Sequence, residues 1–529
     1  MAQGLIDLNV DVQSHIISFL SSPLDLFALR RTSMYFLELT TSALCAKTKD
    51  MPLRCAADLV AFYRFLRIGD PSSRTAVLVK DLRFELQPDL LRDANSNGYQ
   101  LPGIDLSEAV EAFTGILDHC RHLRRLHMVR WYPPVPPSLL YHALSNLTDL
   151  EELELNIDQD VETQDLLRLA NLPLRRLVCL CAPQMASQFR HFAVFGPLAR
   201  ILVELELPMY AHKCKFLGAT FISVRKLALW VSRGRAFVHD LHPTFPNLSH
   251  LTLRGQCPWG HPHGRWVNEN GEATNEEIRR THTEQWKGVS GAWPSLKSIR
   301  VEDPRTAYLL VLNRSVPCLS LTWLSNTPEH VFPTAVADTR PTCLEFVIDQ
   351  QSYMGSLRVR QGPYVGLLEL AGRPAATSSL RYLVVYFRRF NIPSERWCVE
   401  DADIIHLLAS AVANLPVTHL MIKFDFGSLY LDSIHRNRRD AIVNYLQYTY
   451  DNEDGIKLLN VAETWVTELA GSSRTLQWIG VYVPRDRIRC WEVFRQAGGE
   501  EGEWETTLWE VDEDEAWEPL SAEPLREFT

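Results

Sequence analysis

Four side chains that can bind zinc lie in one polar stretch near the middle of the chain. Within residues 256–292 these are Cys257, His261, His263 and His282. Structural zinc sites are built from ligand pairs with short, regular spacing, as in C-x-x-C or H-x-x-x-H. These four residues do not form such pairs. We therefore predict a polar loop here and no metal site.

Two thiols and the missing enzyme motifs bear on catalysis. Cys179 and Cys181 are one residue apart in an apolar run, which places both on one face of a strand and predicts buried structural thiols. The sequence has no G-x-S-x-G elbow, no phosphate-binding glycine loop and no dinucleotide fingerprint. We predict that the protein is not an enzyme and uses no cofactor.

Composition and charge exclude further classes of partner. The 529 residues carry a net charge of −10 and their basic clusters are short, so no nucleic-acid partner is predicted. Eleven irregularly spaced cysteines without a preceding secretory signal pattern indicate reduced thiols in the cytoplasm or nucleus. No apolar run approaches the roughly 18 residues that span a bilayer, so we expect a soluble protein without a membrane partner.

The elements that must position any binding residues follow from a short apolar pattern. An apolar residue recurs at the first, fourth and sixth positions of a six-residue frame, and many successive copies are 22 to 28 residues apart. The first positions of the thirteen copies are Val79, Leu123, Leu150, Leu174, Leu202, Val224, Leu248, Leu296, Cys318, Cys343, Leu380, Val417 and Leu476. This spacing is typical of leucine-rich repeats.

The frame predicts an α/β fold. Each copy supplies one short strand with inward apolar residues, followed by a helical or irregular return segment. We predict an irregular leucine-rich-repeat solenoid with a curved parallel sheet over residues 74–497, with insertions at 256–292 and 426–475. We expect helices near 275–286, 440–450 and 456–470. The alternative is an α/β body unrelated to such repeats.

The acidic segment 498–529 contains three tryptophans. It is either a disordered tail or a segment that folds back with these rings packed.

The variable positions of each strand point away from the apolar core. Early copies place charges there, namely Arg125, His127, Glu152, Glu154, Arg176, Glu204 and Glu206. Later copies place aromatic rings there, namely Trp230, Tyr382, Tyr386, Trp478 and Tyr482. Exposed aromatic residues are good binding anchors, so we predict that these five bind a protein substrate and that the charged half orients it. The alternative is that the C-terminal segment covers the rings.

The N-terminal residues 5–45 predict a small helical head. Val12, Ile16 and Leu20 fall on one face of a helix, and Ser22-Pro23 begins a second one. A third helix follows Ser33. Three helices of this length cannot bury a core of their own, so the head must lean on the body. Residues 46–73 contain an apolar helical pattern at 53–68, which we interpret as a bridging helix.

The head resembles the F-box, most closely that of fungal F-box proteins. The residues that carry the resemblance are Leu8, Asp11, Val12, Ile16, Phe19, Leu20, Pro23, Asp25, Leu26, Leu29, Arg31, Ser33 and Phe36. The repeat body likewise resembles the divergent leucine-rich repeats of that family. In this family the motif docks on the Skp adaptor subunit of a cullin-RING ubiquitin ligase, and the remaining chain selects the protein to be ubiquitinated.

The resemblance implies a substrate-recognition subunit of an SCF-type E3 ubiquitin ligase. It bridges the Skp adaptor, and through it a cullin, to an unknown protein substrate. The adaptor-binding residues would be Leu8, Val12, Ile16, Leu20, Pro23 and Leu26. One departure is Asn9, because the family usually has proline after the first leucine. Asn9 favours the alternative that the chain is a leucine-rich-repeat scaffold acting outside ubiquitin ligation.

Overall fold

A computed structural model describes most of the chain after its first fifty residues. It describes single positions between 13 and 48 and the ranges 52–53, 55–67, 74–85, 106–128, 136–156, 163–180, 192–210, 217–231, 238–255, 275–287, 291–302, 304–312, 314–323, 330–349, 362–388, 397–425, 453–483, 487–497 and 504–511.

The described strands form one sheet in which each strand neighbours the next one in the sequence. They are β1 (Asp81–Phe84), β2 (Arg125–Met128), β3 (Glu152–Asn156), β4 (Arg176–Leu180), β5 (Glu204–Tyr210), β6 (Lys226–Val231), β7 (His250–Gly255), β8 (Ser298–Val301), β9 (Cys318–Trp323), β10 (Cys343–Asp349), β11 (Tyr382–Arg388), β12 (His419–Asp425), β13 (Trp478–Val483), β14 (Arg487–Ala497) and β15 (Trp504–Val511). Neighbours from β1 to β5 and from β7 to β13 are parallel. The last two pairs, β13–β14 and β14–β15, are antiparallel.

Each of the thirteen predicted frames coincides with one of the strands β1 to β13. Wherever the structure describes their side chains, the fourth and sixth frame residues are buried, as Leu153 and Leu155 show in β3 and Leu383 and Val385 show in β11. The predicted mixed α/β architecture with a long, mainly parallel sheet is therefore confirmed.

Two of the frames are wrong by two residues. In the ladder Ile299 of β8 pairs with Leu319, and Leu319 pairs with Leu344 of β10. The predicted frames that begin at Cys318 and Cys343 instead placed Leu321 and Phe346 level with Ile299 in the sheet. A shift of two leaves every side chain on its predicted face, because side chains alternate along a strand. Both strands carry apolar residues on both faces, so the apolar pattern did not specify the register there.

Helical segments connect most of the strands. They are α5 (Ala56–Arg67), α6 (Arg74–Leu78), α8 (Leu106–His119), α9 (Pro137–Ser145), α10 (Thr163–Leu169), the 3-10 helix η2 (Phe192–Arg200), α11 (Val238–Thr244), α12 (Asn275–Lys287), α13 (Pro304–Leu310), α14 (Val331–Thr339), α15 (Gly362–Ala371), α16 (Pro374–Thr377), α17 (Trp397–Val412) and α19 (Glu453–Ser472). The helices predicted near 53–68, 275–286 and 456–470 are confirmed by α5, α12 and α19. The helix predicted at 440–450 lies outside the described residues.

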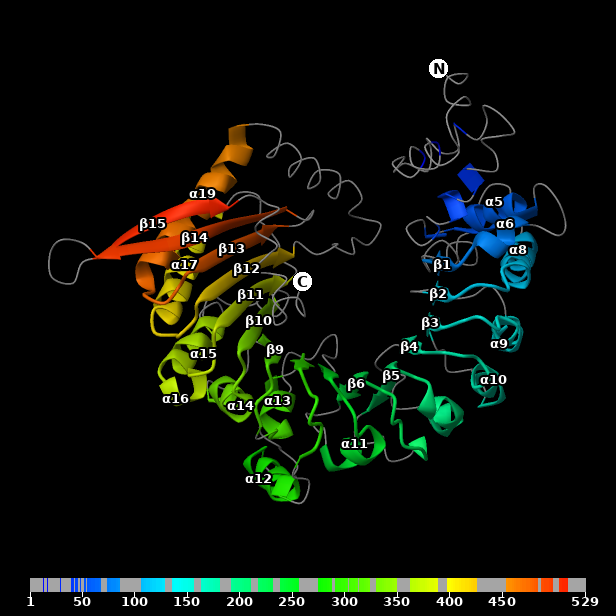
Figure 1. Cartoon of the computed structure of the whole chain (residues 1–529), viewed down its shortest axis with the longest axis horizontal. Helices are drawn as coiled ribbons and strands as arrows, with labels where there is room; N and C mark the ends of the chain where they lie inside the picture. The colour runs from blue at the N-terminus through cyan, green and yellow to red at the C-terminus, as the bar shows by residue number, and fades with distance from the viewer. Residues whose placement is uncertain are drawn as a thin grey trace, which may run out of the picture. The chain divides into compact units, whose positions relative to one another are not determined.

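The helices pack against the face of the sheet that carries the frame residues (Figure 1). The rings of Phe113 in α8 and Phe84 in β1 pack edge to face, with their centroids 5.3 Å apart. The ring centroids of Phe332 in α14 and Phe346 in β10 are 4.8 Å apart. Alternation along each strand then leaves the variable residues on the opposite face. None of the described helices lies on that face in Figure 1, and we call it the helix-free face. That face is where a binding surface must be sought.

The chain divides into two compact units. The first unit comprises residues 1–229 and 243–247, and the second comprises 230–242 and 248–529. None of the described helices combines the length and apolar character needed to cross a membrane.

The described positions of the head are helical and contact the bridging helix. Ile17 and Leu44 are buried in one cluster, and Leu29 and Phe65 pack against it. Phe65 belongs to α5. The Tyr63 ring of the same helix lies beside the His119 ring of α8, with the two centroids 5.8 Å apart. Helix α5 therefore contacts both the described head residues and helix α8 of the body.

The acidic C-terminal segment contributes a strand. Residues 504–511 form β15, which pairs with β14 in an antiparallel hairpin. The predicted domain boundary at residue 498 thus falls between the two strands of this hairpin. Residues 512–529 lie outside the described part of the chain.

Candidate binding surface

The helix-free face of the first unit carries a row of alternating charges. Parallel register aligns five residues on neighbouring strands, which we call the charge ladder: Asp81, Arg125, Glu152, Arg176 and Glu204. The Arg125 guanidinium donates to both carboxylate oxygens of Asp81 at 2.5 and 2.9 Å. Arg176 donates to Glu204 at 2.9 Å and lies 3.7 Å from Glu152. Each arginine is thus paired with a neighbouring carboxylate, and the ladder is largely self-neutralising.

A second row lies beside the ladder. It includes Arg83, His127 and Glu154, and the His127 Nδ1 atom lies 2.9 Å from a Glu154 carboxylate oxygen. Burial by itself would raise the pKa of Glu154, but the hydrogen bond with His127 and the charges of His127, Arg176 and Arg83 outweigh it, so the pKa is lowered. Glu154 is therefore held as a carboxylate.

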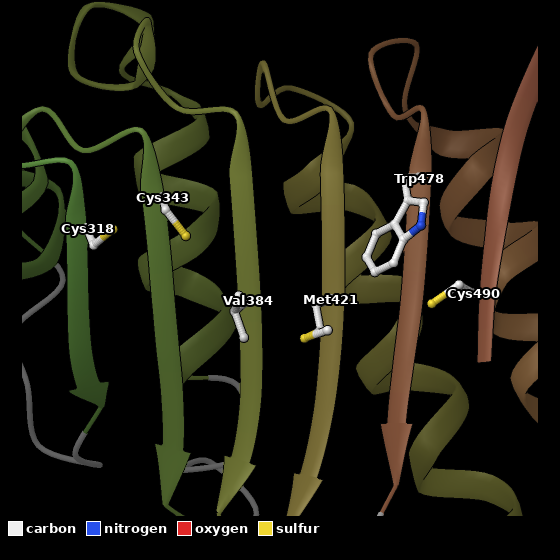
Figure 2. Close-up of a cluster of buried hydrophobic side chains, with 6 residues drawn as sticks. All are labelled: Cys318, Cys343, Val384, Met421, Trp478 and Cys490. Carbon is white, nitrogen blue, oxygen red and sulfur yellow. The ribbon is translucent and has the colours of Figure 1, made fainter. Parts of the chain in front are cut away.

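The corresponding face of the second unit contains a buried, mostly apolar group of side chains. Figure 2 shows six residues on successive strands, which we call the buried cluster: Cys318, Cys343, Val384, Met421, Trp478 and Cys490. Tyr382, Tyr482 and Val511 pack against it and are partly buried. Val384 has the same frame position as His127 in the first unit, between the two inward apolar residues of its strand. In the second unit this frame position holds Arg300, Ser320 and Glu345 on β8 to β10 and the core residues Val384 and Met421 on β11 and β12.

The indole of Trp478 lies along its own strand over Gly480. A Cβ atom at position 480 would overlap the ring carbons of Trp478. Trp478 is only 3% exposed, so the expectation of an exposed ring at this position is wrong. Because residue 480 has no side chain, the ring can lie flat on the sheet instead of projecting from it.

The tyrosines of the predicted aromatic surface are joined by two residues of β12. His419 lies between Tyr382 and Trp478, with ring centroids 4.8 and 6.1 Å away. The Lys423 ammonium lies over the rings of Tyr386 and Tyr482, at 6.0 and 5.5 Å from their centroids. The structure thus brings these aromatic residues together through a histidine and a lysine.

Sequence reasoning missed His419 and Lys423, although the signal was available. Both occupy variable positions of their frame, as Tyr382 and Tyr386 do in the preceding strand. Burial lowers the pKa of His419. The pKa of Lys423 is also lowered, mainly by burial and further by Arg300, against the opposing charge of Glu345. Both groups therefore lose part of the hydration that would favour their charged forms.

A buried carboxylate completes the polar part of this face. The side chain of Glu345 is 2% exposed and accepts a hydrogen bond from the Ser320 hydroxyl at 2.5 Å and one from Arg300 at 3.2 Å. A buried charge of this kind requires such partners, because a carboxylate without them would be strongly destabilising. These hydrogen bonds link the side chains of three neighbouring strands, namely Arg300 of β8, Ser320 of β9 and Glu345 of β10.

Of the four residues considered as zinc ligands, the structure describes only His282. Cys257, His261 and His263 lie outside the described residues. His282 is buried in α12, and its Nδ1 atom hydrogen bonds the Leu309 carbonyl. Trp286 of the same helix donates to the Leu310 carbonyl at 3.0 Å. Among the described residues no group of three or more potential ligands could hold a metal ion.

Two of the described thiols, Cys343 and Cys490, are poorly suited to nucleophilic chemistry. Burial raises the pKa of Cys490 to about 12, and the pKa of Cys343 is raised well above its ordinary value by burial and by the neighbouring Cys318. Thiols with such pKa values stay protonated near neutral pH and react slowly. Cys179 is buried as predicted, whereas Cys181 lies outside the described residues.

The structure describes the predicted substrate-binding residues but not the predicted adaptor-binding residues. Trp230, Tyr382, Tyr386 and Tyr482 are half-buried on the helix-free face, and Trp478 is buried there. The predicted adaptor-binding residues Leu8, Val12, Ile16, Leu20, Pro23 and Leu26 all lie outside the described residues. No protein-family model matches the chain, and no curated protein matches it significantly.

Proposed function

We propose that the chain is the substrate-recognition subunit of an SCF-type cullin-RING E3 ubiquitin ligase. In this proposal the helical head is an F-box that binds the Skp adaptor, and the body is an irregular leucine-rich-repeat solenoid that binds a protein substrate. The protein itself has no catalytic role. It would act in the cytoplasm, the nucleus or both.

The observation that carries the proposal is the F-box-like residue pattern of the head, placed directly before a body of repeated strand units. The pattern from Leu8 to Phe36 has the apolar spacing and the Ser-Pro helix start of that motif. Thirteen strands in chain order then follow, each at a repeat frame. A body of this kind presents variable side chains from many strands on one face, which suits binding of a protein partner.

A second function is favoured by Asn9. Proline is the usual residue at this place in the F-box, and its replacement suggests a head that no longer docks. The chain would then be a protein-binding scaffold outside ubiquitin ligation. The two functions differ in one measurable property, which is affinity for the Skp adaptor.

Titration of purified Skp adaptor against the full chain tests the proposal. Burial of one large apolar side chain is worth about 1.5 to 3 kcal/mol, so Ile16→Asp or Leu20→Asp should weaken binding by at least about 10- to 150-fold. Leu139→Asp is a matched control, because Leu139 is an exposed apolar residue of α9 in the body.

Binding that is lost in the head variants and kept in the control would support the ligase function. If the intact, folded chain does not bind the adaptor, the scaffold function replaces it. If the control variant loses binding as strongly as the head variants, the adaptor does not dock on the head.

A further inference from the structure

The two ends of the described sheet differ in how their outer edges are covered. At the first end Leu53 pairs with β1: its amide donates to the Arg83 carbonyl at 2.9 Å, and its carbonyl accepts from the Glu85 amide at 3.0 Å. At the other end β15 pairs only with β14, over the eight residue pairs from Cys490–Val511 to Ala497–Trp504. Within the described residues nothing pairs with the outer edge of β15, and such an edge is a template for another strand.

An exposed aromatic pair lies next to this open edge. Trp509 of β15 is 63% exposed and Phe494 of β14 is 43% exposed, with their ring centroids 5.1 Å apart. They are the only aromatic residues among the large, exposed apolar side chains of the described chain. Adjacent exposed apolar side chains can mark an interaction site, and a tryptophan is a favoured anchor of protein interfaces.

The hairpin is held firmly enough to act as a preformed edge. Arg489 of β14 donates to both carboxylate oxygens of Glu510 at 2.5 and 2.6 Å, and to Glu463 of α19 at 3.2 Å. Its guanidinium also lies over the Trp491 ring at 5.0 Å. These contacts tie β15 to the neighbouring strand and helix, so a partner would not have to order it.

Charge determines which partner the edge can accept. From residue 499 to residue 519 the sequence contains ten carboxylates and no lysine or arginine. They are Glu500, Glu501, Glu503, Glu505, Glu510, Asp512, Glu513, Asp514, Glu515 and Glu518. Pairing of two copies of this edge would bring two such segments together, which like-charge repulsion opposes. A strand that carries cations is favoured for the same reason.

We propose that β15 is a docking edge for an extended polypeptide segment in which lysine or arginine alternates with apolar residues. The segment adds to the sheet as a further strand by main-chain hydrogen bonds to the outer edge of β15. Because side chains alternate along a strand, its apolar residues cover Trp509 and Phe494 on one face and its cations lie on the opposite face, where β15 carries Glu510. The inference rests on the proposed function only in that the segment would belong to the ubiquitinated protein.

Fluorescence anisotropy with the full chain and without adaptor tests this inference. The probe is a labelled peptide of four Lys-Val repeats, compared with a Glu-Val peptide and with a Lys-Val peptide N-methylated at its four central residues. We expect the Lys-Val peptide to bind at least tenfold more tightly than either of the others. N-methylation keeps the charge but removes the main-chain donors, so it separates strand addition from simple charge attraction.

Variants and hydrogen exchange complete the test. Trp509→Ala should weaken peptide binding at least tenfold, whereas Leu139→Ala on helix α9 of the first unit should leave it unchanged. Because Trp509 is mostly exposed, this variant should keep the fold, which circular dichroism verifies. Bound peptide should also slow amide exchange within residues 504–511.

Equal binding of the N-methylated peptide, unchanged exchange in β15, or dimerisation of the free chain through this edge would each overturn the proposal. Because no adaptor is present, the result is independent of the adaptor titration.

Discussion

The helix-free faces of the two units are built on the same strand frame but differ in how much of each is charged and how much is buried. In the first unit neighbouring strands are linked by ion pairs such as Arg125–Asp81 and Arg176–Glu204. In the second unit this face has one ion pair, Arg300–Glu345, and its later strands carry residues such as Val384 and Met421, which are almost fully buried. The frame residues therefore determine where the strands form, and the variable residues determine whether a face is solvated or packed.

The difference has an energetic consequence. Partly exposed ion pairs contribute about 0 to 1 kcal/mol each, whereas a buried apolar side chain contributes about 1.5 to 3 kcal/mol. The face of the second unit should thus contribute more to stability, and the face of the first unit should be freer to bind or exchange partners.

The sharpest test of this comparison places a charge in the buried cluster. Val384→Asp should lower the unfolding free energy of the second unit by about 3 kcal/mol or more, because the carboxylate would be buried without a partner. The matched variant His127→Ala, at the same frame position in the first unit, should cost about 1 to 2 kcal/mol. Hydrogen exchange of β11 and β2 in denaturant measures the two effects separately. Equal costs would remove the distinction between the faces.

Substitution of Gly480 tests the packing of Trp478. Gly480→Ala should destabilise the second unit by about 1 to 3 kcal/mol, because the added methyl group overlaps the indole. Gly471→Ala is the control, since nothing lies within 4 Å of a Cβ there, and in helix α19 it should be neutral or stabilising by up to about 1 kcal/mol. Adding Trp478→Leu to Gly480→Ala should make the glycine substitution less costly. If it does not, the ring does not lie over Gly480.

The two faces should also differ in their response to acid. The pKa of His419 is lowered by burial from its ordinary value of 6.5, so the folded state favours the neutral ring. Its contribution is complete above pH 6.5 and is lost as the pH falls through the lower folded pKa. The pKa of Glu154 is lowered from 4.5, so the first unit loses this contribution only in more acidic solution.

Denaturation of the second unit between about pH 8 and pH 5 measures this effect. His419→Gln should flatten the dependence while leaving the Tyr382 and Trp478 rings in place. A slope that is unchanged in this variant would assign the acid sensitivity to another group.

The smallest expected effect concerns the charge ladder. Arg176→Met should destabilise the first unit by about 1 kcal/mol, since it removes ion pairs with Glu152 and Glu204 that are only partly shielded from water. The cost should shrink in 1 M salt because of screening. Arg64→Met breaks the more exposed pair with Glu108 and should have no measurable effect in the same titration. A salt-independent cost at Arg176 would point to lost packing of its stem rather than lost charge.

The strands could be predicted from sequence because their inward residues repeat. The register of β9 and β10 could not, since Leu319, Leu321, Leu344, Phe346 and Ile348 offer several equivalent apolar frames. The alternation of hydrophobic residues specifies a strand's faces, but it fixes the register only where one face is polar.

The binding surface was predicted less completely than the strands. The predicted aromatic residues lie on the expected face of the sheet, but Trp478 is buried rather than exposed. The sequence did not show this, because it does not give the direction in which the indole lies over Gly480. Strand β15 was missed because its acidic flanks resemble a disordered tail, although Thr506, Thr507 and Trp509 have high strand propensity.

The strict chain order of the sheet has a consequence for biosynthesis. Since each strand pairs with the one before it, a strand leaving the ribosome finds its partner already made. Contacts between sequence neighbours also keep the loops that must close short, which lowers the entropic barrier to each addition. The sheet can therefore grow by one strand at a time from β1, whose outer edge is already paired with Leu53, a residue translated before it.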